Sequence, residues 1–182
     1  MYFELIINIE TDFGIKRPDD MPEELIFITG SKITLPVTDP MVFTTKAESG
    51  DTIPDYWDGG VPIMSERFVK LIEDAGVDNI EKFPAIVKSI NDSTIWSGYY
   101  AINIIGMVKC ADLNKSTYTE IFPDNYDFEE LAIVASKAHG ALLFRLQESP
   151  STIIIHKSVG KHILKNDPDE ELIGWDVKEI IQ

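Results

Sequence analysis

Residues 61–76, Val-Pro-Ile-Met-Ser-Glu-Arg-Phe-Val-Lys-Leu-Ile-Glu-Asp-Ala-Gly, are the stretch that decides the fold class. Their apolar start predicts a strand, and the Ser65 hydroxyl can cap a helix that begins at Glu66. Apolar side chains at positions 68, 71, 72 and 75 have the i, i+3, i+4, i+7 spacing of one helix face. Gly76 can adopt the left-handed conformation that ends a helix. The segment therefore predicts a strand, an amphipathic helix and a tight stop.

The same order of elements is expected near the other end of the chain. Residues 153–180 predict a strand, a helix over Lys157–Lys165 and a final strand from Trp175 to Ile181. A shift of 91 residues matches three identical positions, which indicates a weak internal strand-helix-strand repeat. Between the copies, 80–91 and 99–108 are typical of strands. The pattern predicts an α+β fold, with a mixed or mostly antiparallel sheet covered by a few short helices.

The first third of the chain is rich in strand-forming residues. The apolar runs 25–29 and 32–37 flank Gly30-Ser31, which predicts a β-hairpin. We expect residues 1–60 to form a β-rich N-terminal lobe that packs on an α+β domain over residues 61–182. The two parts are expected to form one structural unit.

The net charge of the chain is strongly negative and unevenly spread. There are 31 acidic and 16 basic residues, which gives 16 − 31 = −15. Residues 1–60 carry −8, residues 61–110 carry −1 and residues 111–182 carry −6. Phosphate backbones and anionic lipid headgroups repel such a protein, so binding to nucleic acid or to a membrane surface is not expected. The acidity favours a cationic partner, or serves solubility alone.

The cysteine content and the apolar runs predict the compartment. Cys110 is the single cysteine and lies in an apolar run, so we expect a small buried hydrophobic side chain with no disulfide. Residues 1–5 lack the positive region of a signal peptide, and no apolar run reaches the length of a membrane span. We expect a soluble, cytoplasmic protein.

Motifs that would indicate catalysis are weak in this sequence. There is no glycine-rich phosphate loop, and the three histidines lack the spacing of metal ligands. Ser65 lies outside a nucleophile-elbow motif and is better explained as a helix cap. No catalytic residue, metal or cofactor is therefore assigned. Acid pairs such as Asp19-Asp20 leave open a small acidic enzyme, or an adaptor domain, with a carboxylate-lined pocket.

Three segments combine acids with turn residues, and two of them also contain aromatic side chains. Tyr and Trp are enriched in binding hot spots, whereas exposed acids set the electrostatic attraction of a partner. Two alternatives are that Trp57 folds back onto the core and that the acids are merely solvated. The candidate partner-binding residues are Asp55, Tyr56, Trp57 and Asp58, then Asp124, Tyr126 and Asp127, and then Asp167, Asp169 and Glu170.

Several short motifs occur in an order that resembles a known family. They are Pro62-Ile63-Met64-Ser65-Glu66-Arg67, Gly76-Val77-Asp78, Phe83-Pro84, the run 99–112, Leu143-Phe144-Arg145-Leu146, and Ile155 followed by Gly174-Trp175. Over roughly residues 61–181 the chain resembles immunity protein family eleven of bacterial polymorphic toxin systems, formerly a domain of unknown function. The resemblance implies a non-catalytic protein that binds a toxin encoded next to it and occludes it. The acidity adds the expectation of a basic toxin surface.

Overall fold

The computed structural model describes residues 1–9, 13–19, 21 and 25–182. It confirms the α+β class, because strands predominate and the helices are short. In chain order the elements are β1 (Tyr2–Asn8), β2 (Ile15–Lys16), α1 (Leu25–Ile28), β3 (Met41–Thr45), β4 (Tyr56–Asp58), β5 (Pro62–Ser65), α2 (Glu66–Asp74), β6 (Ile80–Ser89), β7 (Ile95–Ile104), β8 (Met107–Val108), β9 (Thr117–Phe122), β10 (Asn125–Glu130), the 3₁₀ helix η1 (Ala135–Ala138), β11 (Leu143–Leu146), β12 (Ser149–His156), α3 (Lys157–Asn166) and β13 (Gly174–Glu179).

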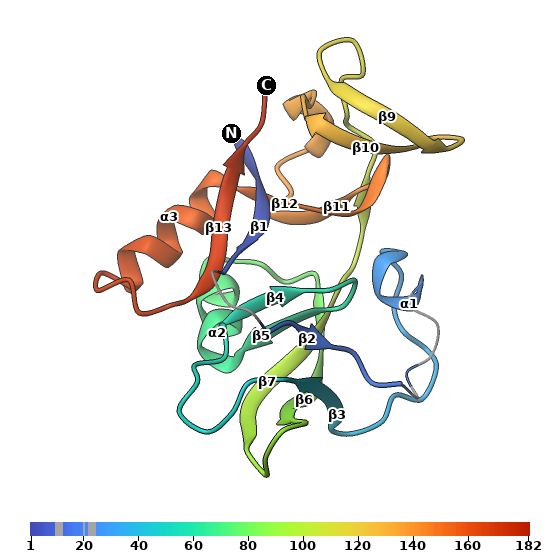
Figure 1. The fold of residues 1–182 in the computed structure, drawn as a ribbon. Helices are drawn as coiled ribbons and strands as arrows, with labels where there is room; N and C mark the ends of the chain where they lie inside the picture. Colours follow the sequence, from blue (N-terminus) through green and yellow to red (C-terminus); the bar gives the residue numbers. More distant parts are fainter. Residues whose placement is uncertain (10–12, 20, 22–24) are drawn as a thin grey trace.

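Most strands belong to two mixed, mainly antiparallel sheets (Figure 1). The central sheet has the order β2-β3-β6-β7-β5-β4, and the terminal sheet has the order β13-β1-β12-β11-β8. Parallel pairing occurs between β3 and β6 and between β11 and β8, whereas the other neighbours are antiparallel. A third, two-stranded sheet of β9 and β10 stands apart and is called the arm below.

The predicted strand-helix-strand repeat is confirmed by the topology. The first copy is β5-α2-β6 and the second is β12-α3-β13. In each copy one strand, antiparallel to both, separates the two strands: β7 lies between β5 and β6, and β1 lies between β12 and β13. The strands of each copy are thus parallel to each other, and the helices α2 and α3 are in contact. The fold is therefore two split strand-helix-strand units joined through their helices.

The largest core cluster joins both units. It includes Phe68 and Ile72 from α2, Val159 and Ile163 from α3, and apolar residues of both sheets. A ring contact of 5.6 Å between the centroids of Phe68 and Trp175 links the first unit to β13. Burial of this shared apolar surface is the main force that holds the two sheets together.

The predicted hairpin over residues 25–37 is wrong. Residues 25–28 form the short helix α1, and no strand occurs over 32–37. Phe27 is fully buried and meets Phe83 edge-to-face at 5.7 Å. Gly30 has a φ of +68°, and its carbonyl accepts a hydrogen bond from the Gly106 amide at 2.7 Å. Long-range contacts therefore determine the conformation here, and the local turn signal alone predicts the wrong one.

The predicted strand over residues 99–108 is divided. β7 begins earlier, at Ile95, and ends at Ile104, and β8 follows after Gly106. Gly106 has a φ of +100°, a conformation that breaks an extended strand and that glycine tolerates best. The break lets the chain leave the central sheet through β7 and enter the terminal sheet through β8.

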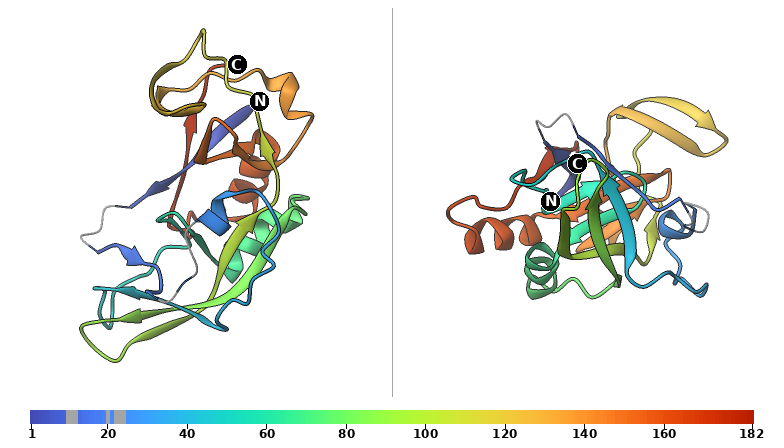
Figure 2. Two further views of the ribbon diagram at one scale, coloured as in Figure 1. Left: turned by 90° about the vertical axis from the view of Figure 1, so that its right-hand side faces the viewer. Right: turned by 60° about the horizontal axis from the view of Figure 1, so that its bottom comes forward.

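The first 60 residues contribute strands to both sheets. β1 lies inside the terminal sheet, and β2, β3 and β4 belong to the central sheet. The two chain ends lie side by side in all three views of the ribbon (Figures 1 and 2). The Tyr2 amide donates to Gln182 Oε1 at 3.0 Å, and Gln182 Nε2 donates to the Tyr2 carbonyl at 2.9 Å. None of the helices within the described part of the chain is long and apolar enough to cross a bilayer.

Candidate partner-binding surface

The arm projects from the body of the molecule as a separate antiparallel hairpin (Figure 1). All six residues of β9 are exposed. Asp124, at the turn, has a φ of +61°, and its side chain is 80% exposed. The Tyr126 amide, two residues after Asp124, donates to the Glu148 carbonyl at 2.8 Å and thereby ties the turn end of the arm to the body. At the other end Lys178 Nζ donates to the Glu129 carbonyl at 3.3 Å, so the arm is held to the body through β10 and presents β9 to solvent.

Aromatic rings stiffen the arm from within. The Tyr118 and Tyr126 ring centroids are 4.9 Å apart, and Phe128 lies 5.9 Å from Tyr118 and 6.0 Å from Tyr126. Ile121 and Phe122 do not belong to this group and are 52% and 68% exposed. Two large apolar side chains are therefore exposed beside the turn of the hairpin, where burial against a partner would be favourable.

The arm is also the most acidic hairpin of the chain. Residues 117–130 contain no Lys or Arg, and their five acids are Glu120, Asp124, Asp127, Glu129 and Glu130. Lys109 Nζ approaches Asp124 Oδ1 at 3.7 Å, a pair that is open to solvent and weak. The arm therefore combines a net charge of −5 with exposed apolar groups, and this combination suits a partner with basic and apolar patches.

The predicted site around Asp55–Asp58 lies mostly inside the molecule. Tyr56 is 1% exposed and packs near Phe68 in the shared core. Trp57 packs against the core cluster of the central sheet, as the alternative interpretation proposed. Asp55 accepts hydrogen bonds from the Ser65 hydroxyl at 2.5 Å and from the Ile173 amide at 3.0 Å. Through these contacts Asp55 stabilises the start of α2 and holds the segment before β13 against it.

Asp58 is half-buried and interacts electrostatically with Arg145 of the terminal sheet. One of its oxygens accepts the Gly60 amide at 2.9 Å, and burial raises the pKa of its carboxyl while Arg145 opposes the rise. Arg145 is fully buried, and its Nη1 donates to the Pro150 carbonyl at 2.7 Å. Burial lowers the pKa of the guanidinium, and Asp58 counteracts this effect. The carboxylate thus compensates a buried cation of the terminal sheet.

The acidic loop after α3 is clamped by an arginine that the sequence patterns missed. Arg67 approaches Glu171 at 2.9 Å, Asp167 at 3.7 Å and Asp55 at 3.9 Å. Asp167 also accepts the Leu172 amide at 3.0 Å, which shapes the loop from within. Asp169 and Glu170, by contrast, are exposed. Asp55 and Asp167 therefore meet through Arg67, and only the outer acids of this loop face solvent.

The structure does not bring the three predicted segments together on one surface. The arm lies at one end of the molecule, and the loop after α3 lies at the side (Figure 1). The sequence patterns singled out Asp124, Tyr126 and Asp127 but missed Glu120, Ile121 and the exposure of Phe122. Alternation in 117–122 followed by Pro123-Asp124-Asn125 is a hairpin signal that could have identified the arm.

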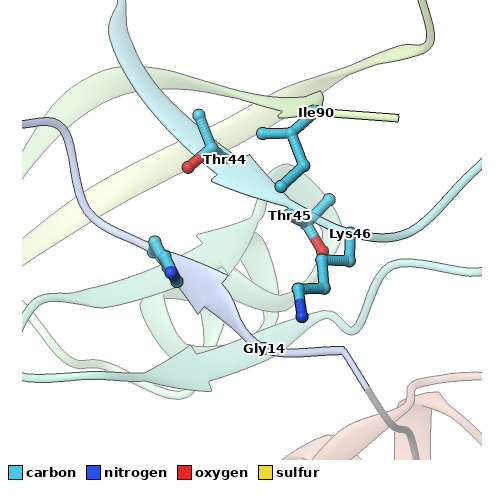
Figure 3. A pocket seen from close by; sticks show the side chains of 6 residues that line it. Gly14, Thr44, Thr45, Lys46 and Ile90 are labelled. Carbon is cyan, nitrogen blue, oxygen red and sulfur yellow. The ribbon is translucent and has the colours of Figure 1, made fainter. Parts of the chain in front are cut away.

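Pockets in the described part of the chain do not assemble a catalytic set. Figure 3 shows one of about 190 Å³ between β2 and β3, lined by Gly14, Lys16, Thr44, Thr45, Lys46 and Ile90. The carboxyl groups whose pKa burial raises, Glu4 and Asp58, line none of the described pockets. Cys110 is buried, as predicted, and burial raises the pKa of its thiol to about 12. No group of three metal-ligating side chains occurs among the described residues.

A compact α+β body with a protruding acidic arm, whose apolar side chains are exposed, is typical of a protein that binds another protein. A family model described as immunity protein family (Imm11) matches residues 9–181, so the chain belongs to this immunity protein family. The match begins at residue 9 and includes most of the N-terminal third, which the motif resemblance had left out. A search among curated proteins found no match.

Proposed function

We propose that this protein neutralises a cognate bacterial toxin, encoded beside it, by binding the toxin stoichiometrically in the cytoplasm. Membership of the immunity protein family supports toxin binding. The observation that carries the choice of surface is the arm, which lies outside both sheets and exposes Ile121 and Phe122 among five acids. The arm occludes the toxin by lying across its functional surface.

The apolar side chains of the arm set the lifetime of the complex. Burial of a large apolar side chain contributes about 1.5–3 kcal/mol, which corresponds to roughly a ten- to hundredfold change in affinity. Phe122, at 68% exposure, has the most surface to lose among the exposed aromatic rings of the arm. Affinity differences of this kind appear mainly in the dissociation rate.

The acids of the arm set the rate of association. Asp124 and Asp127 are exposed and lie beside the apolar end of the hairpin. Attraction between such acids and a basic toxin surface accelerates encounter, and salt screens it. Asp169 and Glu170 add attraction from the side of the molecule. Asp55, Tyr56, Trp57, Asp58 and Asp167 support the fold around α2 instead of providing the main contact.

Kinetic measurements with the product of the adjacent gene test this assignment. We expect Phe122→Ala to raise the dissociation rate at least about tenfold with little change in association. We expect Asp124→Asn/Asp127→Asn to slow association and to flatten its dependence on ionic strength. The matched controls are Leu35→Ala, an exposed apolar residue elsewhere, and Asp78→Asn/Glu179→Gln, two exposed acids outside the arm. If the arm variants behave like the controls, the arm is not the contact surface.

A titration of toxin activity tests the stoichiometric mechanism. If binding alone protects the cell, residual toxin activity falls linearly and reaches zero at one equivalent of this protein. A catalytic mechanism, as in the alternative of a small acidic enzyme, would abolish toxin activity at a small fraction of one equivalent. Co-expression that leaves the toxin active, with no complex in size-exclusion chromatography, would overturn the proposed function.

A further inference from the structure

A second surface, separate from the arm, has the form of an apolar groove. It lies between α3 and the terminal sheet and has a volume of about 250 Å³. Phe3, Leu164, Trp175 and Val177 line it with carbon, and Leu164 is 58% exposed. Lys157 and Lys161 are the charged residues among those that line it. The groove thus has an apolar interior with two lysines of α3 at its wall.

The positive charge of α3 is unusual for the chain. α3 carries three lysines and no acid, whereas the whole protein has a net charge of −15. In the described part of the chain Lys161 has no hydrogen-bond or ion-pair partner, and Lys157 Nζ reaches only the Met1 sulfur, at 3.5 Å. A thioether is a weak acceptor. Both ammonium groups are therefore available to an anion.

Gly160 keeps the groove open at a cost to the helix. It lies inside α3, where glycine is less favourable than other residues, and its φ is not positive. A Cβ built at this position would meet no atom within 4 Å. Neither backbone conformation nor close packing therefore requires glycine here. What the missing side chain does provide is free space in the wall of the groove.

We propose that this groove binds a free medium-chain fatty acid. Its alkyl chain lies against Phe3, Leu164, Trp175 and Val177, and its carboxylate pairs with Lys157 and Lys161. A peptide fits less well, because the apolar interior offers no partners for buried backbone amides. A membrane surface fits less well, because anionic headgroups repel the protein as a whole.

Calorimetric titration with a series of saturated fatty acids, from butanoate to decanoate, tests the fit. We expect saturable one-to-one binding that tightens about fourfold per added methylene, which is the transfer free energy of one buried CH₂ expressed as a ratio. The gain should stop when the chain exceeds the groove. Octanoate should bind more tightly than methyl octanoate and octylammonium. No saturable binding of octanoate, or equal binding of all three head groups, overturns the proposal.

Variants locate the site and separate it from non-specific adsorption. We expect Lys157→Glu/Lys161→Glu to weaken octanoate at least about tenfold while octanol binding stays unchanged. The control Lys88→Glu, an exposed lysine on the central sheet, should bind octanoate normally. An equal loss of octanoate affinity in the double variant and in the control would show an effect of net charge instead of a specific site, and would overturn the proposal.

Gly160→Leu blocks the groove without weakening the fold. Leucine favours the helix, so we expect its melting temperature to rise by about 2–3 °C while octanoate binding is lost. Gly160→Ala, with a smaller side chain, should keep most of the affinity. Unchanged binding in Gly160→Leu would contradict the assignment. Toxin binding through the arm does not depend on this groove, so failure of either proposal leaves the other standing.

Discussion

Arg145 is the largest side chain that the fold buries completely, and it carries a charge. Its Nε and Nη2 have no hydrogen-bond partner among the described residues, and only its Nη1 donates to a carbonyl. Asp58, whose charge raises the pKa of Arg145, comes from the edge strand of the other sheet. Removing only one of two such charges destabilises the fold strongly, whereas removing both together destabilises it less.

This cost predicts the outcome of a double-mutant cycle. Arg145→Met should destabilise the protein by about 2–3 kcal/mol, because the half-buried Asp58 carboxylate loses its counter-charge and the Pro150 carbonyl loses its donor. Adding Asp58→Asn should recover about 1–3 kcal/mol of that loss. Urea unfolding of the two single variants and the double variant measures the coupling. Strict additivity would mean that the two side chains do not interact.

Asp92 gives a prediction for acid conditions. The Thr94 amide at 2.8 Å and the Ser49 amide at 2.9 Å donate to its carboxylate, and these hydrogen bonds lower its pKa to about 2 from 3.8. A lowered folded-state pKa adds stability that is complete above pH 4 and is lost as the pH falls toward 2. Asp92→Asn should therefore lower the melting temperature at pH 6 and flatten its fall between pH 4 and pH 2. A wild-type pH slope in the variant would contradict this account.

At the scale of elements, α2 begins as the sequence predicts. The Ser65 hydroxyl accepts the Phe68 amide at 3.1 Å and donates to Asp55. α3 uses His156 instead, whose Nδ1 accepts the Ser158 amide at a longer 3.3 Å. The two copies of the repeat thus start their helices with different caps, and the first cap also connects β4 to the helix.

Removal of the first cap should have a measurable effect. We expect Ser65→Ala to cost about 1–2 kcal/mol, because an amide of the first turn loses its acceptor and Asp55 loses a donor. Ser97→Ala, at an exposed serine of β7 whose side chain makes no hydrogen bond within the described part of the chain, is the matched control and should change stability little. Chemical denaturation followed by circular dichroism measures both variants. Equal effects would show that the cap contributes nothing specific.

Local patterns predicted the elements whose formation depends on neighbours in the sequence. α2, α3 and β6 follow from periodicity and caps, and the repeat follows from their order. The structure of residues 25–37 was predicted wrongly, because it depends on distant contacts. Phe27 packs against Phe83 of β6, and Gly30 accepts a hydrogen bond from Gly106. The burial of Tyr56 was not predictable for a similar reason. A strand of three residues does not show which of its faces the rest of the protein covers.

The candidate site shows the same limit. Acids and aromatic residues in 122–127 indicated a binding segment, but the separation of the arm from both sheets depends on the whole topology. The ion pairs of Arg67 could not be predicted from the sequence, because its partners lie 12 residues before it and about a hundred residues after it. Local composition identified residue types suited to binding, whereas their positions on the surface follow only from the complete fold.

At the scale of the whole molecule, we propose that residues 1–60 and 61–182 form one structural unit. β1 pairs on one edge with β12 and on the other with β13, and β3 pairs with β6. We expect a single cooperative unfolding transition with coincident fluorescence and circular dichroism midpoints. A fragment of residues 61–182 should give the poorly dispersed NMR spectrum of an unfolded chain. A well-dispersed spectrum would show an independent domain instead.

The position of β1 has a consequence for synthesis on the ribosome. β1 is among the first segments to be made, yet its neighbours β12 and β13 come from the last 34 residues of the chain. At bacterial elongation rates it waits on the order of 10 s for them, with its apolar side chains exposed. The split unit β5-α2-β6-β7 is contiguous and can form during that interval. The terminal sheet can therefore form only after β12 and β13 have been made, later than the split unit of the central sheet.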